Sequence, residues 1–231
     1  MGKYNNLIKC YLIAEIGVNH NGDMHLAKEM INAAIMSGAD AVKFQTFKAE
    51  TLVTTGTPKV RYQEATTTPD ETHYQMIKKL ELKEDQHVLL KEYCDEIEVD
   101  FISTPYDPAS VDFLESLDVQ QYKIASADLV DLELLKRVAA TKKPVIIAVG
   151  MARLGEVEDA LEVFTDYDLG DLLLLHCVSN YPCSDGSLNL RVIETLRSAF
   201  THPVGYSDHS IGSKASVLSI ALGVKVIEKH F

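Results

Sequence analysis

Two histidines near the end of the chain stand where they could hold a metal ion. His209 closes the run 205–209 and His230 closes the run 226–230, and both runs resemble strands. Neighbouring strands lie about 5 Å apart, so the two imidazoles could converge on one divalent ion completed by a carboxylate or water. Mn²⁺, Co²⁺, Fe²⁺ and Zn²⁺ all accept such a site, and the sequence does not separate them. His20, in a loop with Asn and Gly, is a third candidate ligand or else a polar contact.

A carboxylate also interrupts an apolar run near the start of the chain. The run 12–17 is typical of a buried strand, yet it contains Glu15, and Asp23 follows as the N-cap of a helix. An ionised carboxylate is costly to bury alone. Glu15 is therefore expected to be paired, bound to a metal or used in chemistry.

Two lysines lie inside strand patterns. The two-residue period of the run 41–46 places Lys43 and Gln45 on one face, and Lys123 and Ser126 lie near the end of a later strand. Inward-facing lysines in an acidic protein favour an anionic substrate. The alternative is a Lys–Asp ion pair internal to the fold.

Polar residues follow two further strands. Ser103 and Thr104 precede a proline, and they could donate to a ligand or only form a turn. Asn180 and Tyr181 follow another strand and could hydrogen-bond a polyol. His176 lies inside the apolar part of that strand, where we interpret it as a core residue with its own hydrogen-bond partner.

The elements that must position these side chains alternate along the chain. The pattern predicts a (β/α)₈ TIM barrel of residues 1–231 that lacks its last helix, as in a truncated piece of a longer chain. The insertion 47–84 is expected to hold a polar tract over 54–72 and a short helix near 74–80. A loop of this length is typical of a lid, a substrate loop or a disordered segment. Strands are predicted over 10–17, 41–46, 100–105, 121–126, 145–150, 172–177, 204–208 and 225–231, and helices over 23–38, 85–98, 108–117, 131–141, 155–166, 188–199 and 212–222.

Composition limits the partners. The 231 residues are 46% hydrophobic and 24% charged, which suits one large domain. A net charge of −12 disfavours nucleic acid and anionic membranes. The sequence has no signal-peptide pattern or membrane-spanning run, and its four cysteines form no CxxC pair, so a cytoplasmic location is expected.

Taken in order, the motifs resemble the sialic acid synthase family, which are (β/α)₈ enzymes of the N-acetylneuraminate synthase type. The resemblance covers nearly all of the chain. It implies condensation of phosphoenolpyruvate with N-acetylmannosamine or a related N-acylated amino sugar, giving N-acetylneuraminate or a related nonulosonic acid plus phosphate. The motifs are Ala14–Gly17, Asn19–Gly22, Val42–Gln45, Ser103–Pro105, Lys123–Ser126, Gly150–Met151, His176–Cys177, Tyr181–Pro182, Gly205–His209 and Glu228–Phe231.

The resemblance also implies a role for each candidate residue. His209 and His230 would bind a divalent metal, Mn²⁺ in the first place, with Mg²⁺ or Co²⁺ as alternatives. Glu15 would be the catalytic acid/base group. Phosphoenolpyruvate would be bound by Lys43, Thr104, Lys123, Ser126 and Ser207, and the sugar by Gln45, Asp128, Asn180 and Tyr181.

Some positions depart from the family pattern. Ala148 and Val149 stand where members often carry Ser or Thr, Ser179 where they carry Asn, and Asp128 where they carry Glu. These departures are expected to affect how tightly phosphate is bound and which sugar is accepted. The family also has a C-terminal antifreeze-like domain, absent from this chain, through which a homodimer would form and complete each sugar pocket.

Three alternatives stay open at this stage. The acceptor could be a diamino sugar leading to legionaminic or pseudaminic acid. A Schiff-base aldolase could use Lys43 or Lys123 as its nucleophile, with no role for the two histidines. A catalytically silent sugar-binding barrel is the third, suggested by Ala148 and Val149.

Overall fold

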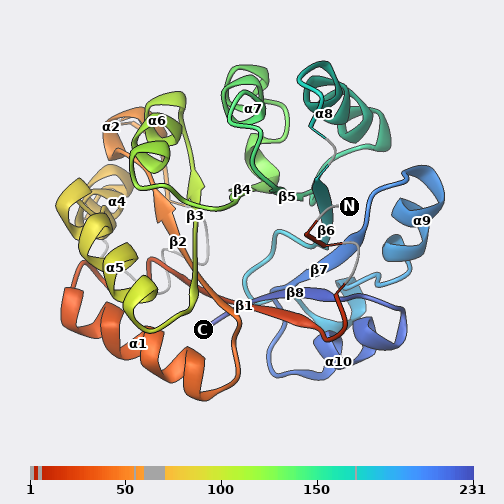
Figure 1. The fold of residues 1–231 in the computed structure, drawn as a ribbon, viewed down its shortest axis with the longest axis horizontal. Coiled ribbons are helices and arrows are strands. Elements are labelled where there is room, and N and C mark those ends of the chain that lie inside the picture. The colour runs from red at the N-terminus through yellow and green to blue at the C-terminus, as the bar shows by residue number, and fades with distance from the viewer. Residues whose placement is uncertain (1–2, 5–6, 55, 60–70, 170) are drawn as a thin grey trace.

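The structure is a computed structural model that describes residues 3–4, 7–54, 56–59, 71–169 and 171–231. Eight parallel strands close into a barrel in sequence order, and helices form a ring around it (Figure 1). The predicted (β/α)₈ architecture is thereby confirmed. The strands are β1 (Tyr11–Gly17), β2 (Ala41–Thr46), β3 (Asp100–Pro105), β4 (Tyr122–Ile124), β5 (Val145–Ala148), β6 (Leu172–Cys177), β7 (Val204–Asp208) and β8 (Val226–His230).

The helices of the described residues include those predicted between the strands, several of them shorter than the sequence pattern indicated. They are α1 (Met24–Met36), α2 (Ala49–Leu52), α4 (His73–Leu80), α5 (Glu84–Glu96), α6 (Pro108–Ser116), α7 (Leu132–Ala139), α8 (Leu154–Asp166), α9 (Val192–Ala199) and α10 (Lys214–Ala221). Among the described residues, no helix is long and apolar enough to cross a membrane.

Closure of the barrel brings the first and last strands together. β1 pairs with β2 on one side and with β8 on the other. Glu15 consequently stands in register with Lys43 on one neighbour and with His230 on the other. Residues more than 200 positions apart are thus placed side by side at the same end of the barrel.

The apolar residues form two layers. One fills the barrel interior and includes Ile13, Ile102, Ile146 and Leu173, and the other lies between the strands and the helices. Strand β7 packs so closely that a Cβ at Gly205 would lie 2.6 Å from Leu175 Cδ2 and from the Val226 carbonyl oxygen. A glycine is required there because the contact with the backbone carbonyl of Val226 cannot be relieved without moving a barrel strand.

Several boundaries differ from the sequence prediction; among the strands, β5 ends early, at Ala148 instead of residue 150. Strand β4 ends at Ile124 instead of residue 126, and Ser126–Asp128 forms a 3₁₀ turn closed by a hydrogen bond from Asp128 N to Ala125 O of 3.1 Å. The insertion contains α4, as predicted, and also the short helix α2. Residues 55 and 60–70 of its predicted polar tract lie outside the described residues.

Candidate active site

A large cavity opens at the carboxyl ends of the strands. Its volume is about 1420 Å³, larger than the roughly 300 to 1,000 Å³ typical of a site for one small ligand. Such a cavity can hold two small molecules side by side. Of the candidate residues, those that line it are Glu15, Lys43, Gln45, Thr104, Lys123, Ser126, Tyr181, Ser207, His209 and His230.

The floor of the cavity is a cluster of buried charges. Lys43 Nζ lies 2.6 Å from Glu15 Oε2 and 3.6 Å from Glu228 Oε2. Lys123 Nζ lies 3.3 Å from Glu228 Oε1, so Glu228 bridges both ammonium groups. All four side chains are nearly inaccessible to solvent. Two carboxylates and two ammonium groups balance one another, which makes burial of the cluster possible.

The two carboxylates differ in their surroundings. Burial raises the pKa of Glu15, and the neighbouring Lys43 only partly offsets this. Burial acts on Glu228 in the same direction, but Lys123, Lys43 and a 2.8 Å hydrogen bond from Ser207 Oγ outweigh it and lower its pKa to about 2. Glu228 is therefore the fixed anion of the cluster, and Glu15 is the carboxylate better suited to carry a proton.

The lysine of β2 is held in its charged form. Burial alone lowers the pKa of Lys43, but Glu15 and Glu228 together raise it above its ordinary value. Lys43 Nζ also donates to Thr104 Oγ1 at 3.2 Å. An ammonium group fixed in this way can orient an anion that enters the cavity.

The two predicted histidines meet at the rim of this cluster. The ring centres of His209 and His230 are 5.6 Å apart, and the Tyr181 ring packs against His209 at 4.1 Å. His209 Nδ1 lies 2.7 Å from the Val178 carbonyl oxygen, so Nδ1–H donates and Nε2 keeps its lone pair. Burial lowers the pKa of His209. The side chain of His230 lines the cavity. Its burial by the surrounding protein and the positive charge of Lys43 lower its pKa to about 4.

These histidines fit a divalent metal ion with open coordination positions. Bonds of about 2.1 Å from one nitrogen of each ring would bring the ring centres to roughly 5 Å, close to the observed separation. Both imidazoles are neutral, as metal ligation requires. Among the described residues no group of three His, Cys, Asp or Glu side chains is arranged to hold an ion. Water or substrate oxygens would therefore complete the coordination.

Contacts of the neighbouring residue Asp208 hold the loop that carries His209 in place. Asp208 is fully buried on the opposite face of β7, where it accepts hydrogen bonds from Ser210 N at 2.9 Å and Ser216 Oγ at 2.6 Å. Lys229 Nζ pairs with it at 3.1 Å. These contacts of Asp208 therefore hold the adjacent His209 in position.

Strand alternation separates the paired hydroxyl residues of β3. Thr104 faces the cavity, whereas Ser103 faces outward and hydrogen-bonds Thr46 Oγ1 at 2.6 Å. In the turn after β4, Ser126 Oγ accepts a hydrogen bond from Gly150 N, which follows β5, at 3.0 Å. A Cβ at Gly150 would lie 2.6 Å from Cys177 Sγ and 3.1 Å from Ser126 Oγ, so glycine lets the backbone approach both side chains.

Four other sequence interpretations fall outside the cavity lining. Asp128 and Asn180 are not among the lining residues. His20 is buried against Phe44, and its Nδ1 accepts from Gly22 N at 2.9 Å, which fits the polar-contact reading and not a metal ligand. His176 donates from Nε2 to the Leu188 carbonyl at 2.8 Å and is a core residue, as predicted.

Sequence reasoning missed two contributors to the site. Glu228 received no role, although the two-residue period that points His230 inward also points Glu228 inward. The helix α4 was placed correctly, but nothing in its pattern showed that Met76, Ile77 and Leu80 line the cavity.

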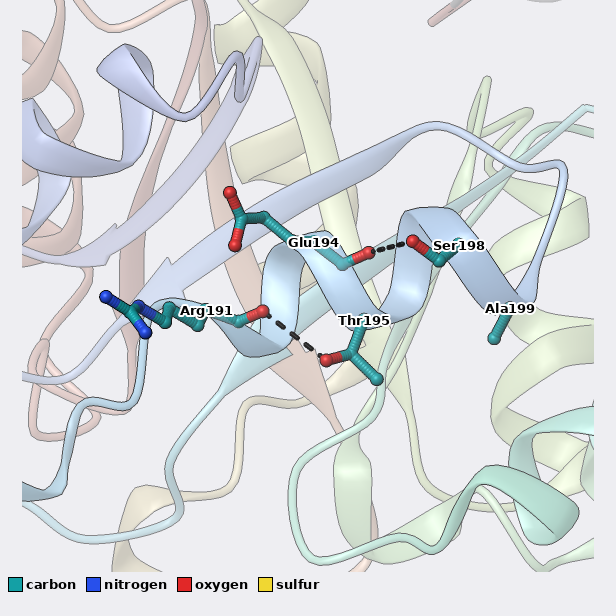
Figure 2. Close-up of a pocket in the computed structure, with 5 residues that line it drawn as sticks. All are labelled: Arg191, Glu194, Thr195, Ser198 and Ala199. Atoms are coloured by element: carbon teal, nitrogen blue, oxygen red, sulfur yellow. Dashed lines mark hydrogen bonds between the residues drawn. The ribbon is translucent and has the colours of Figure 1, made fainter.

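A second hollow lies on the outer side of the ring, along α9 (Figure 2). It is lined by Arg191, Glu194, Thr195, Ser198 and Ala199. The Thr195 and Ser198 hydroxyls donate to the backbone carbonyls of Arg191 and Glu194 within the same helix. No charged cluster like that of the barrel cavity meets there, so the cavity is the candidate active site.

Comparisons with known proteins identify the relatives of this chain. The NeuB family model matches residues 30–231. The chain is 48% identical to N,N'-diacetyllegionaminic acid synthase of Legionella pneumophila, over 96% of this chain and 64% of the relative. It is 34% identical to N-acetylneuraminate-9-phosphate synthase of Drosophila melanogaster, over 96% of this chain and 59% of the relative. The chain thus spans less than two thirds of either relative.

A solved structure gives the same result. The crystal structure of the N-acetylneuraminic acid synthetase from Leptospira borgpetersenii, in complex with citrate, superimposes with a TM-score of 0.86 at 33% identity. The match covers 100% of this chain and 79% of that one. The similar proteins include synthases of sialic, legionaminic and pseudaminic acids. The family predicted from the motifs is thereby confirmed, and the chain belongs to the NeuB family.

Proposed function

We propose that this protein condenses phosphoenolpyruvate with an N-acylated amino sugar and releases phosphate, forming a nine-carbon 2-keto acid. The observation that carries the proposal is the buried cluster of Lys43, Lys123, Glu15 and Glu228 beside the histidine pair. It supplies cationic groups for an anion, a carboxylate for proton transfer and two neutral imidazoles for a metal ion.

The cationic side of the cavity suits phosphoenolpyruvate. Lys43 and Lys123 would bind its phosphate and carboxylate, and the hydroxyls of Thr104, Ser126 and Ser207 would orient them. Both lysines are paired with carboxylates, so a bound anion would give them a second partner. The large cavity leaves room for a sugar beside it.

His209 and His230 would hold the divalent ion, for which we propose Mn²⁺, with Mg²⁺ or Co²⁺ as alternatives. When bound, the ion would supply Lewis-acid polarisation of the sugar aldehyde. Carbon three of phosphoenolpyruvate would then attack this aldehyde, and water would add at carbon two before phosphate leaves. Glu15, with its raised pKa, would exchange protons with the reacting oxygens.

For the acceptor we favour a di-N-acetylated amino sugar over N-acetylmannosamine. The support is that the chain is more similar to the legionaminic acid synthases than to the N-acetylneuraminate-9-phosphate synthase. Gln45 and Tyr181 line the cavity and would contact the sugar. From the family resemblance we further propose a cytoplasmic homodimer, in which the C-terminal domain typical of the family would complete the partner's sugar pocket.

The Schiff-base alternative has less support. A lysine nucleophile needs a lowered pKa, because only the neutral amine attacks a carbonyl. The pKa of Lys43 is raised instead, and Lys123 is paired with Glu228. Borohydride reduction in the presence of pyruvate should therefore trap no adduct, and loss of metal should stop turnover.

The silent-barrel alternative rests on Ala148 and Val149. Ala148 does line the cavity, so one hydroxyl near the phosphate is lost relative to the family pattern. The charged cluster and both histidines are nevertheless present, and Ser126 still offers a hydroxyl on that side. A barrel that only bound sugar would need none of these buried charges.

Asp128 gives a prediction that depends on pH. One of its carboxylate oxygens is buried and has no hydrogen-bond partner among the described residues, and burial together with Asp131 raises its pKa to about 6. A carboxyl with a raised pKa in the folded state costs stability as pH rises from about 4 to 6. Asp128→Asn should therefore be more stable at pH 7 by about 1 to 3 kcal/mol and equal to wild type near pH 3.5.

Urea unfolding at the two pH values measures this difference. If Asp128 binds the acceptor, the same substitution should also raise KM for the sugar and leave KM for phosphoenolpyruvate unchanged. A variant no more stable than wild type at pH 7 would contradict the assignment of an unpartnered carboxylate.

The function itself is tested by product stoichiometry. Purified protein with Mn²⁺, phosphoenolpyruvate and a di-N-acetylated hexosamine should release one phosphate for each 2-keto acid formed. N-Acetylmannosamine should serve less well, and no phosphate should appear without an acceptor. Tight binding of phosphoenolpyruvate without phosphate release from any acceptor would favour the silent barrel instead.

A further inference from the structure

The residues that line the cavity are of two chemical kinds. Most of the charged and hydroxyl groups come from the strand ends. The insertion after β2 contributes Glu71 and Lys79 together with an apolar group. This apolar group consists of Phe47, Leu52, Met76, Ile77 and Leu80, which we call the apolar wall. The proposed reaction at the charged floor does not need it.

Helix α4 contributes the larger part of the apolar wall. Met76, Ile77 and Leu80 have the spacing of residues on one helix face. Met76 is buried, whereas Ile77 and Leu80 keep part of their surface open. Apolar surface left facing a water-filled cavity costs free energy that a ligand recovers by covering it, at about 25 cal/mol per Å².

The apolar wall is held in place by polar contacts on its other side. Lys78 Nζ lies 3.0 Å from both Glu50 Oε1 and Glu81 Oε2, which ties α4 to α2. Tyr74 donates to Glu50 at 2.9 Å, and Glu81 accepts from Ala49 N at 2.9 Å. A surface fixed before the ligand arrives discriminates better than one that must be ordered on binding.

We infer that this apolar wall binds the N-acyl groups of the acceptor sugar and selects acceptors that carry two of them. The inference rests on the function proposed above and adds the residues that choose the substrate. Phosphoenolpyruvate is polar over most of its surface, and an unacylated hexosamine exposes mainly hydroxyls and amines. The methyl groups of two acetamido substituents are the apolar parts that such an acceptor can place against Met76, Ile77 and Leu80.

The test compares two acceptors on polar variants of similar size. Met76→Gln and Leu80→Asn keep the approximate shape of each side chain and remove the apolar contact. Each should lower the ratio of kcat/KM for the di-N-acetylated acceptor to kcat/KM for N-acetylmannosamine by about tenfold, because one methyl or methylene group in an apolar pocket contributes roughly 10- to 200-fold discrimination. KM for phosphoenolpyruvate should stay within about twofold of wild type.

Leu89→Gln on α5 is the matched control, because Leu89 is an exposed leucine that does not line the cavity. It should leave the ratio unchanged. Should the buried Met76 variant fail to fold, Leu80→Asn and the mild truncation Ile77→Val carry the test, the latter with a smaller fall in the ratio. An unchanged ratio in the folded variants would overturn the inference, whereas wild-type protein that uses no acceptor would refute the proposed function itself.

Discussion

Glu15→Gln should reduce kcat by about 10²- to 10⁴-fold while KM for phosphoenolpyruvate stays within about threefold of wild type. Glutamine keeps the shape of the side chain and its place beside Gln45, whose Nε2 lies 3.3 Å from Glu15 Oε1. It cannot carry a proton between reacting oxygens. Removing a negative charge from the cavity also does not oppose binding of an anion. Steady-state phosphate release at varied phosphoenolpyruvate separates the two constants.

Glu29→Gln is the matched control for this variant. Glu29 is a largely exposed glutamate on α1, and its partner His25 is also exposed. The control should have wild-type kcat and KM. If Glu15→Gln kept its kcat and lost only affinity for phosphoenolpyruvate, Glu15 would be a binding residue and the proton-transfer role would be wrong.

The second large effect is expected on stability. Glu228→Gln should lower the free energy of unfolding by roughly 3 to 5 kcal/mol, the usual cost of leaving buried charges without a partner. Glu228 lies within 3.6 Å of Lys43 and within 3.3 Å of Lys123. Without its charge, two buried ammonium groups would share the single carboxylate of Glu15. Urea unfolding at pH 7 measures the loss.

Added anion should restore part of this stability. Phosphoenolpyruvate supplies the negative charge that the variant lacks, and a ligand that binds only the folded state stabilises it in proportion to its concentration. Glu29→Gln serves again as the control, and it should change stability by less than about 0.5 kcal/mol. If Glu228→Gln unfolded at the same urea concentration as the control, the charge cluster would not be the structural basis of the site.

The repeating pattern along the chain predicted the barrel because each level of structure agrees with the next. Runs of apolar residues gave the strands, and polar residues at their ends gave the cavity. Lys43 and Gln45 line the cavity, as their alternation indicated. The two-residue alternation of a strand, counted back from His230, also places Glu228 on the inner face. The sequence therefore contained the information needed to predict Glu228.

Other features depend on packing between distant segments and could not be read from local pattern. The register that places Glu15 between Lys43 and His230 exists only after β1 closes against β8. Strand β4 stops early because Ser126–Asp128 turns, which moves Asp128 away from the cavity lining. The sequence predicted the helix α4, but it did not show that the apolar residues of this helix line a cavity.

The central claim is that phosphoenolpyruvate is condensed at a metal site formed by His209 and His230. It is tested most directly by measuring acceptor-dependent phosphate release from metal-stripped protein before and after Mn²⁺ is added. We expect release to return with Mn²⁺ in wild type and in His25→Ala, an exposed histidine on α1, and to stay absent in His209→Ala, which should also bind Mn²⁺ more weakly by calorimetry. Full release from metal-stripped protein, or Mn²⁺-restored release in His209→Ala, would contradict the account.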